Sequence, residues 1–267
     1  MPCCPTGSFT HQTKVFISLY TGQPVFLDSE RWRQVPFGVH LTIQDQLWHI
    51  VETLPGLIQR ARNVQLEDDC IDEVRAVWAD MINTKQRLEL WLEDLTIVHG
   101  EILFPYNDMP FAIDVNSKAP AFPCMAIACQ LNTYWLYTFI LRTVTDEFRQ
   151  KHLSILNPQS LSDAAPLTHQ HISAITWRVC QTLHYLFHTC QHDVEILMYQ
   201  VCYPNRMLME YFGLHIERYG IQYRWCSVLS RSMCSSQGPP LGACSEFFFD
   251  GYVDVLSLLL VELLMLT

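Results

Sequence analysis

Apolar residues recur at spacings of three and four along most of this chain, a pattern typical of amphipathic helices. The clearest run extends from about residue 67 to residue 98. Its acidic opening, residues 67–69, is interpreted as offsetting the helix macrodipole rather than binding a phosphate or metal. The apolar positions that predict one buried face are Ile71, Val74, Val77, Trp78, Met81, Ile82, Leu88, Trp91, Leu92 and Leu95.

Further helices are predicted on both sides of this run. One begins near Thr42, where Thr42 and Asp45 have the spacing of a capping box, and Pro55-Gly56 is expected to interrupt it. Residues 123–151 are apolar almost all round, so this helix is expected to be deeply buried. A fourth helix is predicted over residues 168–198. Pro204 is expected to break it before two shorter helices over 207–214 and 222–233.

No strand-rich block alternates with these helices, so the predicted fold class is all-α, an irregular bundle of long helices with short attached helices. Residues 41–233 are expected to form the helical domain. Residues 1–40, rich in Pro, Gly, Ser and Thr, are predicted to be an extended lead-in, and residues 234–267 a divergent apolar tail. The apolar run over 252–266 contains Asp254 and Glu262 and is shorter than the roughly twenty residues of a membrane span, so membrane insertion is disfavoured.

Composition narrows the class of protein. The chain has 267 residues, of which 49% are hydrophobic and 16% charged, which excludes a disordered protein. Its 17 basic and 27 acidic residues give a net charge of −10, with no basic stripe, so no direct contact with nucleic acid is expected. Eleven cysteines in an unpaired pattern, without a signal-peptide pattern, favour a reducing intracellular compartment in which most thiols pack in the core.

The usual catalytic motifs are absent from the sequence. It contains no glycine-rich phosphate loop, no His-Glu-x-x-His, no Gly-x-Ser-x-Gly and no Cys-x-x-Cys. We therefore predict no catalytic, cofactor-binding or metal-binding residue, no cofactor, and a protein that is not an enzyme.

The one constellation that resembles a metal site is a histidine row. His184, His188 and His192 are spaced four apart, with Cys190 and Asp193 nearby, so adjacent imidazoles could chelate a divalent ion. The first and third histidines would lie about 12 Å apart along the helix, too far to share one ion. Because no motif supplies further ligands, we interpret the row as a partly buried polar seam.

Four cysteines are candidate nucleophiles. Cys180 and Cys190 flank the histidine row, and Cys124 and Cys129 lie five apart at the start of an apolar helix. A Cys–His pair needs a perturbed thiolate, which spacing alone does not establish. All four cysteines are therefore predicted to pack in the core.

Several blocks of aromatic and aliphatic residues follow one another along residues 40–233. The first is the apolar helix around Trp48 with its Pro55-Gly56 break. The others are Phe122-Pro123 leading into Tyr134-Trp135, Trp177-Arg178 to Tyr185 followed by Tyr203-Pro204-Asn205-Arg206 and Met209 to Phe212, and Tyr223-Arg224-Trp225 to Leu229. In order and spacing these blocks together resemble the regulatory domain of fungal binuclear zinc-cluster transcription factors.

The resemblance implies a nuclear transcription regulator that controls a metabolic or secondary-metabolite gene set. The family's DNA-binding module, a six-cysteine cluster holding two zinc ions, has no counterpart here, because only Cys3 and Cys4 precede Cys70. The implied protein is a regulatory domain without its own DNA reader. It would contact transcription-machinery proteins or a DNA-binding partner, and a homodimer or heterodimer is compatible with this role.

Alternatives stay open at this point. The sequence from residue 235 onward departs from the family pattern, so we expect a truncated or altered end, for instance by read-through of an intron. A helical enzyme or small-molecule-binding protein with an apolar pocket, using His184 and His188 as polar or metal groups, is one alternative. A tail-anchored membrane protein is another.

Overall fold

The computed structural model describes residues 15, 18, 42–64, 70–100, 122–156, 168–190, 193 and 196–235, and this part of the chain is all-α, with no strand, as predicted. Of the predicted lead-in only Val15 and Ser18 are described, both helical and buried. The predicted tail lies outside the described residues apart from its first two positions. The elements are α3 (Ile43–Val51), α4 (Leu54–Asn63), α5 (Ile71–His99), α6 (Met125–Lys151), α8 (His169–Thr189), the π-helix η4 (Leu197–Cys202), α10 (Tyr203–Leu214) and α11 (Ile216–Ser235).

The chain divides into two compact units, each described here by itself. The α3–α5 unit comprises Thr6–Glu101 and Tyr134–Ile175, and the α10–α11 unit comprises Met1–Pro5, Ile102–Thr133 and Thr176–Thr267. The division between the units falls inside both α6 and α8, so one part of each of these helices belongs to each unit.

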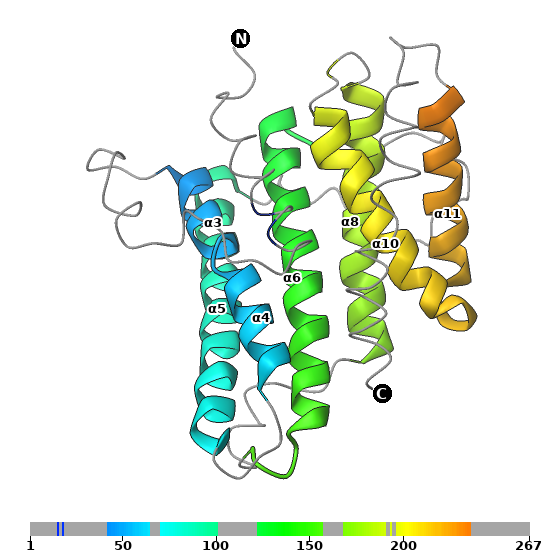
Figure 1. Cartoon of the computed structure of the whole chain (residues 1–267). Helices are drawn as coiled ribbons and strands as arrows, with labels where there is room; N and C mark the ends of the chain where they lie inside the picture. The colour runs from blue at the N-terminus through cyan, green and yellow to red at the C-terminus, as the bar shows by residue number, and fades with distance from the viewer. Residues whose placement is uncertain are drawn as a thin grey trace. The chain divides into compact units, whose positions relative to one another are not determined.

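In the α3–α5 unit, α3 and α4 pack against the long helix α5 (Figure 1, blue and cyan). The predicted apolar face of α5 is confirmed in its main part, while Ile71 is exposed at the first turn. Arg60 on α4 forms ion pairs with Glu73, at 3.1 Å, and Asp80, at 2.6 Å, on α5. The buried α5 residues are Val74, Val77, Trp78, Met81, Thr84, Leu88, Trp91 and Leu95.

The break between α3 and α4 lies earlier than predicted. α3 ends at Val51, and Pro55 stands inside the first turn of α4 rather than at the interruption. Proline has no N–H to donate. The N–H groups of the first helical turn have no acceptor within the helix, so proline is tolerated there. The Pro55-Gly56 pair was predicted to interrupt a helix. It lies instead in the first turn of α4.

The end of α5 depends on a glycine. Gly100 adopts φ 74°, in the left-handed region, and its N–H donates to the oxygen of Thr96 at 2.8 Å. A side chain at this position would strain the backbone, so glycine is the residue that ends α5 here.

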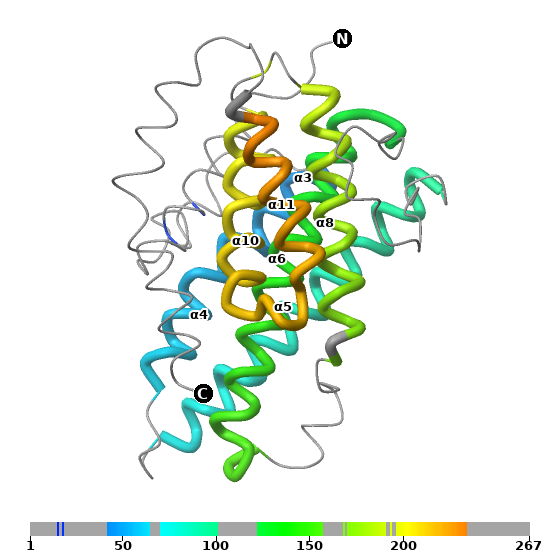
Figure 2. The backbone as a smooth tube through the Cα atoms, turned by 90° about the vertical axis from the view of Figure 1, so that its right-hand side faces the viewer, coloured from blue at the N-terminus to red at the C-terminus, as the bar shows by residue number. Residues whose placement is uncertain are grey.

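In the α10–α11 unit, α10 and α11 lie side by side and join at His215 (Figures 1 and 2, yellow and orange). Asn205 on α10 is buried and donates to the main-chain oxygen of Cys226 at 3.1 Å and to Ser230 Oγ at 2.8 Å. These two bonds join the helices through polar groups in an otherwise apolar contact.

The π-helix η4 is also held by a buried amide. Asn132 Nδ2 donates to the main-chain oxygen of Gln200 at 2.7 Å and to its Oε1 at 3.0 Å. A π-helix departs from the main-chain hydrogen-bond pattern of an α-helix. Here the side-chain amide of Asn132, on α6, donates a hydrogen bond to a main-chain oxygen of η4.

Two predicted boundaries after residue 168 are wrong. α8 ends at Thr189 instead of reaching residue 198, and Asp193 Oδ1 accepts from the N–H of Ile196 at 3.1 Å, which is the geometry of a cap for the next helical segment. Pro204 does not break a helix either, because it lies in the first turn of α10, directly after η4.

Candidate functional site

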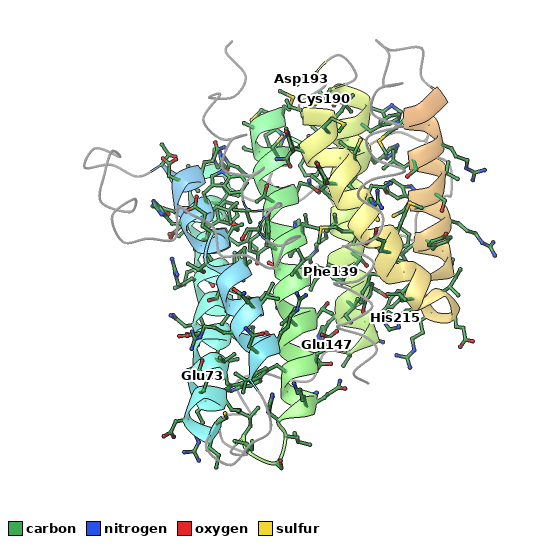
Figure 3. The ribbon with its side chains drawn as sticks, viewed as in Figure 1. Glu73, Phe139, Glu147, Cys190, Asp193 and His215 are labelled. Carbon is green, nitrogen blue, oxygen red and sulfur yellow. The ribbon has the colours of Figure 1, made fainter. Side chains whose placement is uncertain are left out.

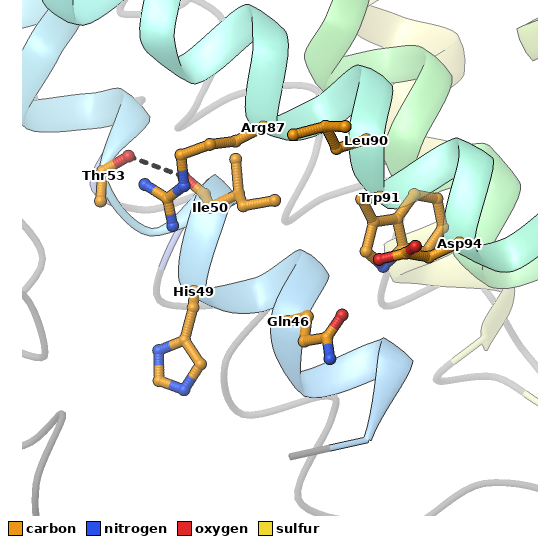
Figure 4. A pocket seen from close by; sticks show the side chains of 8 residues that line it. All are labelled: Gln46, His49, Ile50, Thr53, Arg87, Leu90, Trp91 and Asp94. Atoms are coloured by element: carbon orange, nitrogen blue, oxygen red, sulfur yellow. Dashed lines mark hydrogen bonds between the residues drawn. The ribbon is translucent and has the colours of Figure 1, made fainter.

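A groove of about 480 Å³ lies between α3 and α5 within the α3–α5 unit (Figure 4). Its residues combine an apolar floor with charged and polar rims. α3 and the turn after it contribute four residues and α5 the other four. They are Gln46, His49, Ile50, Thr53, Arg87, Leu90, Trp91 and Asp94.

The α3 wall of the groove is fixed at both of its ends. The predicted capping box is confirmed: Thr42 Oγ1 accepts from the N–H of Asp45 at 3.1 Å, and Asp45 Oδ2 accepts from the N–H of Thr42 at 3.0 Å. At the other end Thr53 Oγ1 donates to the oxygen of Ile50 at 2.7 Å, the bond drawn in Figure 4. Both ends of this short helix therefore have their free main-chain groups partly satisfied.

Trp91 forms the rigid part of the groove. Its Nε1 donates to the oxygen of Ile43 at 2.7 Å, and its ring stacks on Tyr134 with centroids 5.5 Å apart. Tyr134 in turn meets Trp135 edge to face at 4.6 Å. A large buried ring held by a hydrogen bond and a stacking contact keeps this part of the α5 wall in one position.

Beyond the groove, α5 exposes more aliphatic surface. Leu90 is 58% exposed, Ile97 80% and Val98 62%. Spacings of three, four and three from Arg87 through Leu90 and Asp94 to Ile97 place these residues on one face of the helix, with Val98 beside them. We call Leu90, Ile97 and Val98 the α5 apolar strip.

Opposite charges flank the apolar centre of the groove. Arg87 precedes Leu90 on α5 by one turn, and Asp94 follows it by one turn. In Figure 4 both side chains border the groove, with Leu90 and Trp91 between them. The site thus offers a cation towards one end, an anion towards the other and apolar surface in the middle.

Comparisons with known proteins identify no relative. No family model, no curated protein and no solved structure matches this chain. The site must therefore be interpreted from its own residues.

Two of the three histidines of the row lie close together in the described residues. His184 is fully buried, its ring 4.8 Å from that of the exposed His188 and 6.2 Å, edge to face, from that of Trp225. His192 lies outside the described residues. Within the described ranges, no group of three or more His, Cys, Asp or Glu side chains could hold a metal ion.

The predicted cysteine packing is confirmed for Cys180 and Cys190, which are buried, while Cys129 is half-buried. For Cys124 the prediction is wrong: it is exposed, because it precedes the first residue of α6 and lies outside the packed helix. Cys180 hydrogen-bonds with Cys226, also fully buried, and burial chiefly raises the pKa of the Cys226 thiol. A raised pKa opposes nucleophilic chemistry at this pair.

Two ionisable groups, the half-buried Glu147 and the buried His152, lie in the part of the chain around the end of α6 that belongs to the α3–α5 unit. Burial raises the pKa of Glu147 to about 7, with the cation of Arg62 opposing the shift and Asp146 adding to it (Figure 3). His152 is fully buried against Phe148, with ring centroids 4.4 Å apart, and burial lowers its pKa. Neither group lies in the groove between α3 and α5. Their shifted pKa values instead affect the pH dependence of stability.

Within the described ranges, none of the helices has the length and apolar character needed to cross a bilayer. The apolar run over residues 252–266, on which the membrane-anchor alternative rests, lies outside the described residues.

The groove was not predicted from the sequence. The sequence does contain one indication of an exposed apolar surface, because Leu90, Ile97 and Val98 are aliphatic residues that lie outside the buried face of α5. Such outliers among the polar positions of an amphipathic helix indicate an exposed apolar strip, although they do not reveal that α3 supplies the second wall.

Proposed function

We propose that this protein is a helical, transcription-regulator-like protein that acts through protein contacts, with the groove between α3 and α5 as the docking site for an amphipathic helix of a partner. The single observation that carries the docking site is the continuity of the groove with the α5 apolar strip. Exposed aliphatic surface of this kind, bordered by charges, is typical of protein-interaction sites. The proposal assigns the chain no catalytic activity.

The dimensions of the site suit a helix. From Arg87 to Val98 the groove residues of α5 and the strip together extend about 16 Å along the helix, at the rise of an α-helix. A partner helix of about three turns, with apolar anchors at spacings of three, four and seven, would cover it. Leu90, the exposed aliphatic residue among those that line the groove, would contact the central anchor.

The charges of the site favour one direction for the partner helix. The N-terminus of a helix carries partial positive charge and its C-terminus partial negative charge. Pairing these with Asp94 and Arg87 respectively places the partner helix antiparallel to α5. Acidic side chains near the partner's C-terminal end and basic ones near its N-terminal end would strengthen this match.

The transcriptional part of the proposal is supported by the sequence blocks that resemble fungal zinc-cluster regulators. In that setting the partner is a protein of the transcription machinery or a DNA-binding protein, the location is nuclear, and the controlled genes belong to a metabolic or secondary-metabolite set.

A small-molecule ligand is a second candidate, favoured by one observation. The volume of the groove, about 480 Å³, lies in the range of small-molecule sites. A ligand with an anionic group near Arg87 and a cationic group near Asp94 would match the rim. Ligand screening by thermal shift, with Leu90→Glu as the negative control, separates this candidate from the docking of a helix.

A tethered-reporter assay tests the proposed function. The whole chain is fused to a heterologous DNA-binding domain and expressed beside a reporter gene that carries its site. We expect the fusion to change reporter transcription, and Leu90→Glu to abolish that change by placing a charge on the α5 apolar strip. Ala79→Glu, at an exposed position of the same helix about five turns from Val98 and three from Leu90, is the matched control. A reporter response that is absent, or equal in both variants, would refute the proposal.

A further inference from the structure

Several arginines of this protein are paired with carboxylates. Five of the eleven described arginines form ion pairs within or between helices: Arg60, Arg75, Arg142, Arg149 and Arg206. The pairs range from the short contacts of Arg60 to the 3.8 Å contact of Arg75.

Two arginines of α11 are not paired in this way. Arg224 and Arg231 are exposed and form no ion pair with any described residue. The Nε of Arg231 donates only to the oxygen of Ser227 on its own helix, at 3.3 Å. No acidic residue occurs in the sequence between Arg218 and Ser235, so α11 supplies no carboxylate of its own after its first turn.

The two arginines share a face with aliphatic residues. Ile221, Arg224, Val228 and Arg231 follow one another at spacings of three, four and three, which places them along one side of α11. Ile221 is 51% exposed and Val228 half-buried. The opposite side of α11 is buried and includes Gln222, Trp225, Cys226, Leu229 and Met233. We call Ile221, Arg224, Val228 and Arg231 the α11 arginine face.

Local charge distinguishes α11 from the protein as a whole. The helix carries three arginines, Arg218, Arg224 and Arg231, and one acidic residue, Glu217. The whole chain has 17 basic and 27 acidic residues. A helix with an excess of positive charge therefore occurs in a protein of net charge −10.

From these observations we infer that the α11 arginine face binds an acidic, amphipathic helix of a partner protein. Arginine forms forked, bidentate hydrogen bonds with carboxylates, and Arg224 and Arg231 lie about 10.5 Å apart along the helix axis. A helix with two carboxylates seven residues apart and aliphatic residues between them would pair with both arginines and cover Ile221 and Val228. Two arginines in an acidic protein give too little charge to hold a nucleic-acid backbone.

This face is separate in sequence from the groove between α3 and α5, so the inference stands or fails independently of the proposed function. It uses α11, in the α10–α11 unit, whereas the groove belongs to the α3–α5 unit. Variants at Arg224 and Arg231 therefore test it without altering any residue of the groove.

A charge-swap binding assay with the full chain tests the inference. The probe is a fluorescent helical peptide with Glu at two positions seven apart and Leu between them, on an alanine and glutamine background. Anisotropy is measured for the native chain and for Arg224→Glu/Arg231→Glu, with Arg75→Glu as the control at another exposed arginine. Circular dichroism before and after heating confirms that each variant is folded.

We expect the double reversal to weaken peptide binding about tenfold or more, because two charge-assisted pairs become repulsive. Arg75→Glu should bind as the native chain does. A peptide with Lys in place of both Glu residues should bind the double variant better than it binds the native chain. The inference is overturned if a Gln-substituted peptide binds equally well, if the double reversal has no effect, or if the face binds only anionic vesicles or duplex DNA.

Discussion

The indole nitrogen of Trp91 donates a hydrogen bond to the main-chain oxygen of Ile43, the first residue of α3, with the two atoms 2.7 Å apart. The bond joins α3 to α5 at the groove that Trp91 itself lines. Trp91 is 2% exposed, so its ring is packed between elements. One side chain therefore contributes both to stability and to the shape of the docking site.

Replacing Trp91 with Phe should separate these contributions. Phenylalanine keeps an aromatic ring but leaves the oxygen of Ile43 without this donor, so we expect a loss of about 1–2 kcal/mol in the free energy of unfolding. Trp91→Ala also creates a cavity and should lose about 3–5 kcal/mol. Urea unfolding followed by circular dichroism measures both losses. Trp177→Phe, at a half-buried tryptophan, is the control, and equal stability of Trp91→Phe and the native chain would contradict the assigned bond.

Glu147 should make stability depend on pH in a defined direction. Burial raises its pKa in the folded protein to about 7, above the value of 4.5 expected when exposed. The folded state therefore binds more protons than the unfolded state between these values, so stability falls as the pH rises from about 4.5 to 7. Above pH 7 the folded protein must keep a partly buried carboxylate charged.

Glu147→Gln should remove this loss. At pH 8 we expect the variant to be more stable than the native chain by about 2–3 kcal/mol, at 1.36 kcal/mol for each unit of pKa shift and with an allowance for solvent screening. At pH 4.5 the two proteins should be nearly equal. Urea unfolding at both pH values provides the comparison, and Glu93→Gln, at an exposed carboxylate, is the control. Greater stability of the native chain at pH 8 would show that Glu147 has a favourable partner.

Asn205 is predicted to hold α10 against α11. Asn205→Ala removes the donor to the Cys226 oxygen and to Ser230 Oγ in a buried contact, so we expect a loss of about 2–3 kcal/mol. Asn83→Ala, at an exposed asparagine on α5, should change stability by less than about 0.5 kcal/mol. Thermal unfolding measures both. A loss at Asn205 no larger than that at Asn83 would contradict the role of the buried amide.

The cysteines should differ in their rates of alkylation. Cys124 is exposed, whereas Cys180 and Cys226 are fully buried and burial raises the pKa of the Cys226 thiol. Since the thiolate is the reactive form, Cys124 should react with iodoacetamide much faster than either buried thiol. Peptide mass spectrometry at timed intervals gives each rate, and unfolding in urea should equalise the three. Rapid native alkylation of Cys180 would contradict its burial.

Periodicity predicted most of the helices because it reports burial on one face. The face of α5 from Val74 to Leu95 and the capping box at Thr42 were both predictable in this way. Proline positions were predicted less well. Pro55 and Pro204 both lie in first turns, where the missing N–H has no consequence, and the sequence alone does not distinguish a first turn from an interruption.

The groove needed the tertiary structure. Its walls come from α3 and α5, which lie more than thirty residues apart in sequence at Ile50 and Arg87, and no local pattern pairs them. The exposed aliphatic residues on α5 were visible in the sequence, and their meaning depended on which helix lies beside them. For the histidine row, spacing within one helix brought His184 and His188 together without supplying further ligands.

Site-specific photocrosslinking from the groove tests the central claim most directly. Benzoylphenylalanine is placed at position 90, and in a matched chain at position 79, and irradiation is performed in cells that express the protein at native levels. We predict an adduct at position 90 that maps to an amphipathic helix of another protein and is lost when Ile50 is also replaced by Glu, with no such adduct at position 79. The same adducts at both positions, or an adduct at position 90 that persists with Ile50→Glu, would contradict docking in the groove.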